Sequence, residues 1–242
     1  MSVNYGSGAF MPTYAEAEVL AQSLIAVARI AGLPMVAPIV EMDEIMGDAI
    51  GSRLQLREVI DFLSGGKQES RIRALVIEIS AEILVMVGLA ASKDEATDLA
   101  EAHLADGSAL DRFQRMVTSL GGPEDLAANP YAYFPAAPII APLPSPATGF
   151  VEKVDAYAVG IAMVGLGAGR KLASDLLDQD VGLTGMVHIG DAISEGEPLC
   201  ILHCRSQADF DTAARAITAA IAIGSTKPDR RPVITGRLST LV

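Results

Sequence analysis

The chain has 242 residues, of which 50% are hydrophobic and 20% charged, so it can bury one large core or two modest ones and is neither disordered nor collagen-like. Its formal net charge of −12 repels nucleic-acid phosphates and anionic membranes, and we expect neither as a partner.

No apolar run approaches the roughly 20 residues that cross a bilayer. With two cysteines and no apparent secretory signal, a reducing, cytoplasmic location is expected.

The first part of the chain alternates between helix and strand patterns. Thr13 and Glu16 form a capping box before an apolar stripe that stops at Gly32. Residues 35–40 are apolar and interrupted by one proline, Pro38, which predicts a short buried strand. Further helices are predicted at Ser52–Leu63, at Ile72–Ala91, from a cap at Ser92, and from a cap at Ser108 to Gly121. This alternation favours an α/β layer followed by a helical stretch.

The composition changes between residues 129 and 146, where six prolines occur and charge is almost absent. Because proline fixes φ and donates no backbone hydrogen bond, we predict an ordered, extended linker at residues 136–146. The predicted domains are therefore residues 1–135, an α/β domain, and residues 147–242, a β-rich α/β domain.

The second part shows strand patterns separated by turns, with helices on one side. Strands are predicted at Thr148–Val154, Met186–Ile189, Leu199–His203 and Val233–Leu238, and helices after caps at Asp155 and Ser206. Thr148–Val151 and Gly190–Leu199 resemble the two halves of a biotinyl or lipoyl carrier domain. No lysine stands in the carrier motif, so we expect the barrel-sandwich shape without that modification.

Cys200, His203 and Cys204 lie close together, with His188 upstream, which raises the possibility of a zinc site. Along a strand, however, Cys200 and Cys204 face one way and His203 the other, and no second ligand pair has metal spacing. We therefore favour structural cysteines in a core strand over zinc ligands. With three histidines in the chain, no Ser/His/Asp triad can be argued.

Two glycine-rich segments are candidates for ligand contact. Gly165–Arg170 is not a dinucleotide fingerprint, because arginine ends it and a helix precedes it. A tight turn is favoured there, and phosphate binding is the alternative. Gly6–Met11 precedes a capped helix, where small residues let the backbone approach a ligand and the helix N-terminus favours an anion.

In this order, the segments resemble the thymidine and pyrimidine-nucleoside phosphorylase family. Gly6–Met11 is similar to the family's GSGAFM turn, and Met42–Glu58 to its MDxxLGxxxGNxLEVxE segment. Gly165–Asp175, followed by Val181–Leu183, is similar to the GxGRxxASDxID…VGL signature. Gly149–Val151 and Gly196–Leu199 fit the family's C-terminal domain, so the resemblance runs nearly end to end.

The resemblance implies a glycosyltransferase of pyrimidine nucleoside salvage, a pentosyltransferase that cleaves a pyrimidine nucleoside with phosphate as co-substrate. It implies no organic cofactor. Phe10 and Met11 correspond to residues near the base and sugar, whereas no catalytic residue is implied within this chain. The carbonyls of Met46 and Ala49 and the carboxylate of Glu58 correspond to ligands of a potassium-like monovalent cation in some members, and oxygen ligands suit such a hard cation.

The family's phosphate-binding and base-binding residues lie in an N-terminal half that would precede Met1. We therefore expect this chain to correspond to the C-terminal half and to be inactive alone, because phosphorolysis needs donors around the phosphate and the base. An unpaired sheet edge and an apolar face favour a homo-oligomer or a complex with a polypeptide that carries the other half. The alternative is a non-catalytic structural or interaction protein derived from the same fold.

Overall fold

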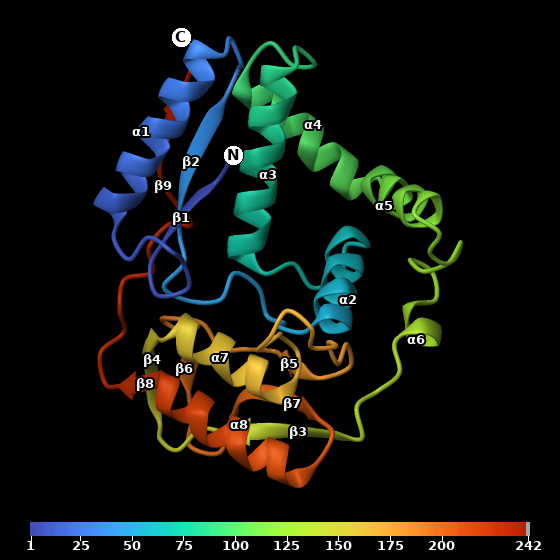
Figure 1. The fold of residues 1–242 in the computed structure, drawn as a ribbon, viewed down its shortest axis with the longest axis vertical. Coiled ribbons are helices and arrows are strands. Elements are labelled where there is room, and N and C mark those ends of the chain that lie inside the picture. Colours follow the sequence, from blue (N-terminus) through green and yellow to red (C-terminus); the bar gives the residue numbers. More distant parts are fainter. Residues whose placement is uncertain (241–242) are drawn as a thin grey trace.

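A computed structural model describes residues 1–240, which form an upper part around one small sheet and a lower, strand-rich part (Figure 1). The helices are α1 (Tyr14–Ile30), α2 (Ser52–Leu63), α3 (Ser70–Met86), α4 (Lys93–Ala105), α5 (Ser108–Ser119), α6 (Pro130–Tyr133), α7 (Ala156–Leu166) and α8 (Gln207–Ala220). The strands are β1 (Val3–Tyr5), β2 (Val36–Glu41), β3 (Ile139–Pro144), β4 (Gly149–Val154), β5 (Gly182–Thr184), β6 (Ala192–Ile193), β7 (Pro198–Cys204), β8 (Ile221–Gly224) and β9 (Ile234–Ser239).

The upper sheet has the strand order β1-β2-β9. β1 is parallel to β2, whereas β9 is antiparallel to it, with Ile39 of β2 opposite both Val3 and Gly236. β2 is buried along its whole length, as its apolar sequence predicts. The helix α1 lies against this sheet with a face that includes Ala17 and Ala21, whose small side chains allow a close approach.

The position of β9 differs from the predicted division of the chain. A strand was predicted near Val233–Leu238, but within the domain of residues 147–242. It instead completes the upper sheet, so the chain crosses back from the lower part after β8 (Figure 1). The division near residue 135 otherwise remains a prediction.

The segment predicted as a linker, residues 136–146, contains the strand β3. β3 pairs antiparallel with β7 from Ile139 opposite Cys204 onward, so it belongs to the lower part. β3 is the outer strand of the order β3-β7-β5, so only one of its sides must form hydrogen bonds with a neighbouring strand. Its prolines, which have no N–H to donate, are tolerated for this reason. Residues 139–144 of the predicted linker thus form a strand of the lower part, and the domain boundary at this segment stays a prediction.

The N-caps predicted at Thr13, Ser92, Asp155 and Ser206 are confirmed, since each side chain accepts the backbone N–H three residues later. The cap predicted at Ser108 is wrong. Gly107 occupies the N-cap position without a side-chain cap, and the N–H of Ser108 donates to Asp106 Oδ1 at 2.8 Å. The predicted helix Ile72–Ala91 corresponds to α3, which ends earlier, at Met86.

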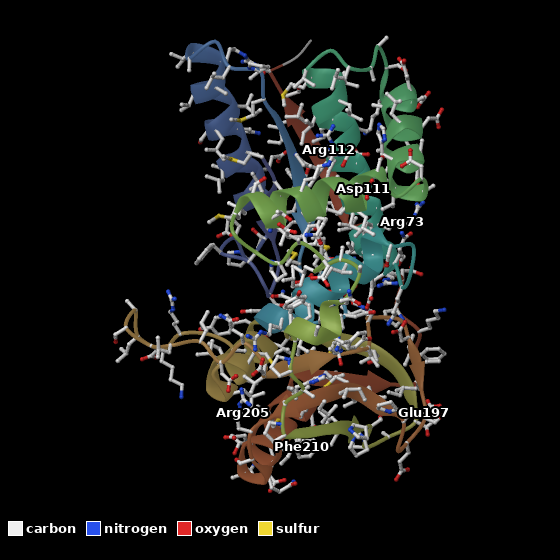
Figure 2. All side chains as sticks on the ribbon, turned by 90° about the vertical axis from the view of Figure 1, so that its right-hand side faces the viewer. Arg73, Asp111, Arg112, Glu197, Arg205 and Phe210 are labelled. Atoms are coloured by element: carbon white, nitrogen blue, oxygen red, sulfur yellow. The ribbon has the colours of Figure 1, made fainter. Side chains whose placement is uncertain are left out.

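Of the three consecutive helices α3, α4 and α5, α5 has the least buried surface. It has no buried residue, and in Figure 2 it crosses the front of the upper part with Asp111 and Arg112 on it. None of the helices in residues 1–240 combines the length and the apolar composition needed to cross a bilayer.

The lower part holds two three-stranded sheets, β3-β7-β5 and β6-β4-β8, that share one hydrophobic core with α7 and α8. The α/β class is confirmed, and the strands of the described residues close no barrel. The strand predicted at Met186–Ile189 is absent. The Met186 N–H instead donates to Asp48 O, in the loop after β2, and the Val187 N–H donates to Leu199 O in β7. Successive residues therefore bond to two different segments and form no ladder with one neighbouring strand.

Cys200 and Cys204 are fully buried in β7, in agreement with a structural role in the core. Burial raises the pKa of Cys200 to about 12 and that of Cys204 to about 11, so both remain thiols. His203 is hydrogen-bonded to Thr184 Oγ1 at 3.0 Å. Within residues 1–240, no group of three His, Cys, Asp or Glu side chains is placed to hold a metal ion.

Candidate functional site

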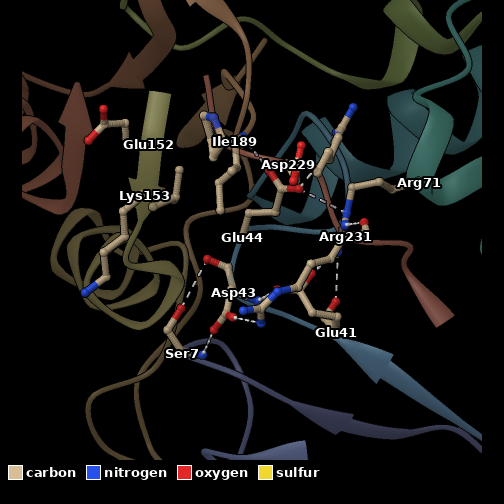
Figure 3. A pocket seen from close by; sticks show the side chains of 13 residues that line it. Ser7, Glu41, Asp43, Glu44, Arg71, Glu152, Lys153, Ile189, Asp229 and Arg231 are labelled. Carbon is tan, nitrogen blue, oxygen red and sulfur yellow. Dashed lines mark hydrogen bonds and ion pairs between the residues drawn. The ribbon is translucent and has the colours of Figure 1, made fainter. Parts of the chain in front are cut away.

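The strands β1 and β2 are parallel, so their carboxyl ends meet at one edge of the upper sheet, with Tyr5 opposite Glu41. The segments that leave this edge are the turn Gly6–Met11 and the loop of residues 42–50. Ligands of open α/β sheets bind outside the carboxyl ends of parallel strands. A cavity of about 330 Å³ lies at this edge (Figure 3), within the size range of small-molecule sites.

The cavity is lined by charged side chains of both signs from both parts of the chain. Its acidic residues are Glu41, Asp43, Glu44, Glu152 and Asp229, and its basic residues are Arg71, Lys153, Arg230 and Arg231. Ser7 of the glycine-rich turn also lines it. The segment that connects β8 to β9 supplies Asp229, Arg230 and Arg231, so the crossing back to the upper sheet forms one wall.

The inner wall of the cavity is a buried ion-pair cluster around Arg71 of α3. Arg71 Nη2 donates to Glu41 Oε2 at 2.7 Å and to Glu41 O at 2.9 Å. Its Nε lies 3.2 Å from Glu44 Oε1, as an ion pair without the alignment of a hydrogen bond. Burial raises the pKa of Glu41 although Arg71 opposes this shift. Buried charges need such partners, so this cluster holds α3 against the end of β2.

His188 of the lower part continues the cluster from the other side. It is 6% exposed, and its Nδ1 lies 3.2 Å from Glu44 Oε2 while its Nε2 lies 2.9 Å from Asp48 Oδ1. Burial alone would lower the pKa of His188, but the hydrogen bonds to Asp48 and Glu44 outweigh it and raise the pKa to about 9. The imidazole is therefore cationic at neutral pH and donates from both nitrogens.

The carboxylates that flank His188 are held in their charged form. Burial would raise the pKa of Glu44 and Asp48, yet the hydrogen bonds from His188 and the neighbouring cations bring both below their usual values. Lys67 pairs with Asp48, and the Ile189 N–H donates to Glu44 Oε2 at 2.8 Å. Positive and negative groups thus alternate from Lys67 through His188 to Arg71.

Residues 150–224 match the family model of the pyrimidine nucleoside phosphorylase C-terminal domain. This match supports a C-terminal region of the thymidine and pyrimidine-nucleoside phosphorylase family in this part of the chain. The matched segment, here called the C-terminal domain, runs from β4 to β8 and includes α7, His188 and α8. It supplies Glu152, Lys153 and Ile189 to the cavity, so the cavity lies between this domain and the upper sheet.

The C-terminal domain also touches the turn that carries the two predicted substrate-binding residues, Phe10 and Met11. The structure does not enclose these two side chains in one pocket. The ring of Phe10 is 99% exposed, whereas Met11 is half-buried against the core between α1 and the upper sheet. Phe10 is therefore available to a ligand on the outer side of the turn, and its role in binding stays a prediction.

The residues predicted as cation ligands, Met46, Ala49 and Glu58, lie where the loop after β2 meets α2. Glu58 Oε1 accepts the Asp48 N–H at 2.6 Å, and the Ala49 N–H also bonds this carboxylate. Burial raises the pKa of Glu58, although these N–H groups oppose the shift. A carboxylate has about four acceptor positions, so these two bonds leave room for a cation. The cation site itself stays a prediction.

Sequence reasoning considered His188 only as a remote zinc ligand and missed its role between two carboxylates. The partners are 144 and 140 residues away along the chain, in a loop whose path no local pattern predicts. The available signal was a single histidine beside the Gly190-Asp191 turn, within a segment otherwise apolar.

Proposed function

We propose that this chain acts as the C-terminal half of a pyrimidine-nucleoside phosphorylase, a pentosyltransferase that moves a pentose from a pyrimidine base to phosphate. The match of residues 150–224 to the C-terminal domain of that family carries the proposal. It is supported by the direct contact between this domain and the Gly6–Met11 turn, where the Ala156 N–H donates to Ser7 Oγ at 3.2 Å.

In this reaction a phosphate oxygen bonds to C1′ of the pentose while the bond from C1′ to the base nitrogen breaks. The electron pair stays on the base, which takes up a proton and leaves. In this proposal the exposed ring of Phe10 contacts the pyrimidine nucleoside, and Met11 follows it in the same turn, half-buried against the core. A potassium-like cation at Met46, Ala49 and Glu58 would supply fixed positive charge near the loop after β2.

We further propose that the chain alone has no phosphorolytic activity. Developing charge on the base and phosphate needs preorganised donors around both. The fully exposed ring of Phe10 is not enclosed by other residues of the described chain. A polypeptide that contributes the phosphate-binding and base-binding groups would complete the site.

The test is to incubate the purified chain with thymidine or uridine in inorganic phosphate and to measure the free base by chromatography. We expect no release above a protein-free blank. Adding a polypeptide that carries the N-terminal half of a family member should restore release, and Phe10→Ala should weaken nucleoside binding in that mixture. Release by the chain alone would refute the proposed inactivity. Failure of the mixture to release base would favour the non-catalytic, structural alternative.

A further inference from the structure

The side chain of Ser7 joins three segments that are far apart in the sequence. Its Oγ donates to the carbonyl oxygen of Asp43 at 3.3 Å and accepts the N–H of Ala156 at 3.2 Å. Its own N–H donates to Asp43 Oδ1 at 3.0 Å. Ser7 therefore connects the glycine-rich turn, the loop after β2 and the first residue of α7. Figure 3 shows Ser7 and Asp43 facing each other at the edge of the cavity.

The hydrogen bond from Ala156 to Ser7 gives a partner to one of the free N–H groups at the N-terminus of α7. The first N–H groups of a helix have no partner within the helix. Asp155, the N-cap, accepts the N–H of Ala158 at 2.9 Å, and Ser7 accepts that of Ala156. A hydroxyl from the turn thus acts as a second cap for the first helix of the C-terminal domain.

The turn fits this place closely. The Gly8 N–H donates to Met42 O at 2.8 Å, and a Cβ added at Gly8 would lie 3.0 Å from both Met42 O and the Cβ of Ala156. The Gly6 N–H donates to Met11 O at 3.0 Å, which closes the turn on itself. Phe10 lies within this closed turn and is exposed, so its position depends on the contacts at Ser7 and Gly8.

We propose that Ser7 is a positioning residue that couples the C-terminal domain to the turn that presents Phe10. Because the hydroxyl bonds both the carbonyl oxygen of Asp43 and the N–H of Ala156, a displacement of α7 acts on the turn. Loss of the hydroxyl loosens the turn from α7, while the N–H groups of Ser7 and Gly8 still hold it to the loop after β2. The importance of Phe10 for catalysis rests on the proposed function. The coupling itself rests only on the contacts of Ser7.

The test uses a single reporter. The chain contains no tryptophan, so Phe10→Trp introduces one indole at an exposed position without disturbing the core. Steady-state fluorescence anisotropy of the full chain then reports how firmly the turn is held. We expect Ser7→Ala in this background to lower the anisotropy and Ser7→Thr, which keeps the hydroxyl, to restore it.

Ser206→Ala is the matched control, because Ser206 caps α8 by accepting the Asp209 N–H at 3.2 Å and lies far along the chain from the turn. It removes an equivalent hydroxyl and should leave the anisotropy unchanged. Asp43→Ala removes the carboxylate that accepts the Ser7 N–H and leaves both bonds of the hydroxyl in place. It should also lower the anisotropy, because one of the three bonds that hold Ser7 is lost, so the proposal stays testable if Ser7→Ala does not fold.

Unchanged anisotropy in Asp43→Ala and in a folded Ser7→Ala, or an equal loss in Ser206→Ala, would overturn the proposal. The readout requires neither nucleoside nor turnover. A failure of the proposed phosphorylase function would therefore leave this result intact, and a failure of the coupling would leave the function untouched.

Discussion

His188 Nε2 lies 2.9 Å from Asp48 Oδ1, and this contact ties the C-terminal domain to the loop after β2. On its other side the same imidazole faces Glu44, which is 2% exposed. A cationic side chain thus stands between two carboxylates at the boundary between the two parts of the chain.

We predict that His188→Ala destabilises the chain by about 3 kcal/mol, because Glu44 and Asp48 would remain charged without their shared partner. Arg71 and Lys67 still neutralise them in part, which keeps the loss at the lower end of the range for broken buried pairs. Urea unfolding measures the change. His103→Ala is the control, since His103 is exposed on α4 and its loss should cost less than about 0.5 kcal/mol. Equal effects of the two substitutions would contradict the prediction.

The stability of the chain should fall on the alkaline side of neutrality. The pKa of His188 is raised from 6.5 to about 9, so its contribution is complete below pH 6.5 and is lost as the pH rises through about 9. At about 1.4 kcal/mol per pKa unit, the loss is roughly 3 kcal/mol. Urea midpoints measured across this pH window test it, and the slope should vanish in His188→Gln.

Two other pH effects fall outside that window. The pKa values of Glu44 and Asp48 are lowered, so their contribution is present above their ordinary values and is lost in acid. The pKa values of Cys200 and Cys204 are raised from 9.0, so stability also declines above pH 9 as the unfolded thiols ionise. A His188→Gln variant that kept the full decline between neutral pH and pH 9 would show that another group causes it.

If Glu58 binds a potassium-like cation, potassium should stabilise the chain. A ligand at roughly ten times its dissociation constant adds about 1.4 kcal/mol, measurable as a higher Tm in potassium chloride than in choline chloride. Glu58→Ala should abolish the difference. Glu101→Ala, which removes a carboxylate paired with Arg73 at the surface, should retain it. The same potassium dependence in both variants would exclude Glu58 as a ligand.

Gly182 marks a close contact between the loop after β2 and the C-terminal domain. It has φ +147°, and a Cβ there would overlap the carbonyl oxygen of Ile50, which accepts the Leu183 N–H at 2.9 Å. We predict that Gly182→Ala costs about 3 kcal/mol in urea unfolding. Gly165→Ala in α7, with open space around it, should instead stabilise by about 0.5 kcal/mol. Similar changes in unfolding free energy for Gly182→Ala and Gly165→Ala would contradict a close contact between Gly182 and Ile50.

We predict that the chain forms a discrete oligomer. β1 is an outer strand of its sheet, and α1 exposes Val27 and Ile30, the latter by 89%. Outer strands and apolar faces favour association, and salt does not screen the burial of apolar surface. Light scattering at low and high salt should therefore show the same species. A monomer at every concentration and in both salts would refute this.

The sequence by itself determined what depends on neighbours along the chain. Thr13, Asp155 and Ser206 could be assigned as caps because each hydrogen bond reaches only three residues ahead. The burial of β2 followed from its run of apolar residues. The family could be inferred from contiguous motifs, of which the match over residues 150–224 confirms the C-terminal part.

The tertiary structure decided what depends on distant partners. Residues 139–144 form a strand because β7 offers it a hydrogen-bonding edge, which local proline content does not reveal. β9 lies beside β2 because the chain crosses back after β8. His188 is cationic because folding places it between two carboxylates at least 140 residues away, and Ser7 caps α7 across 149 residues. Such contacts arise when the two parts pack together, and no periodicity within a single segment encodes them.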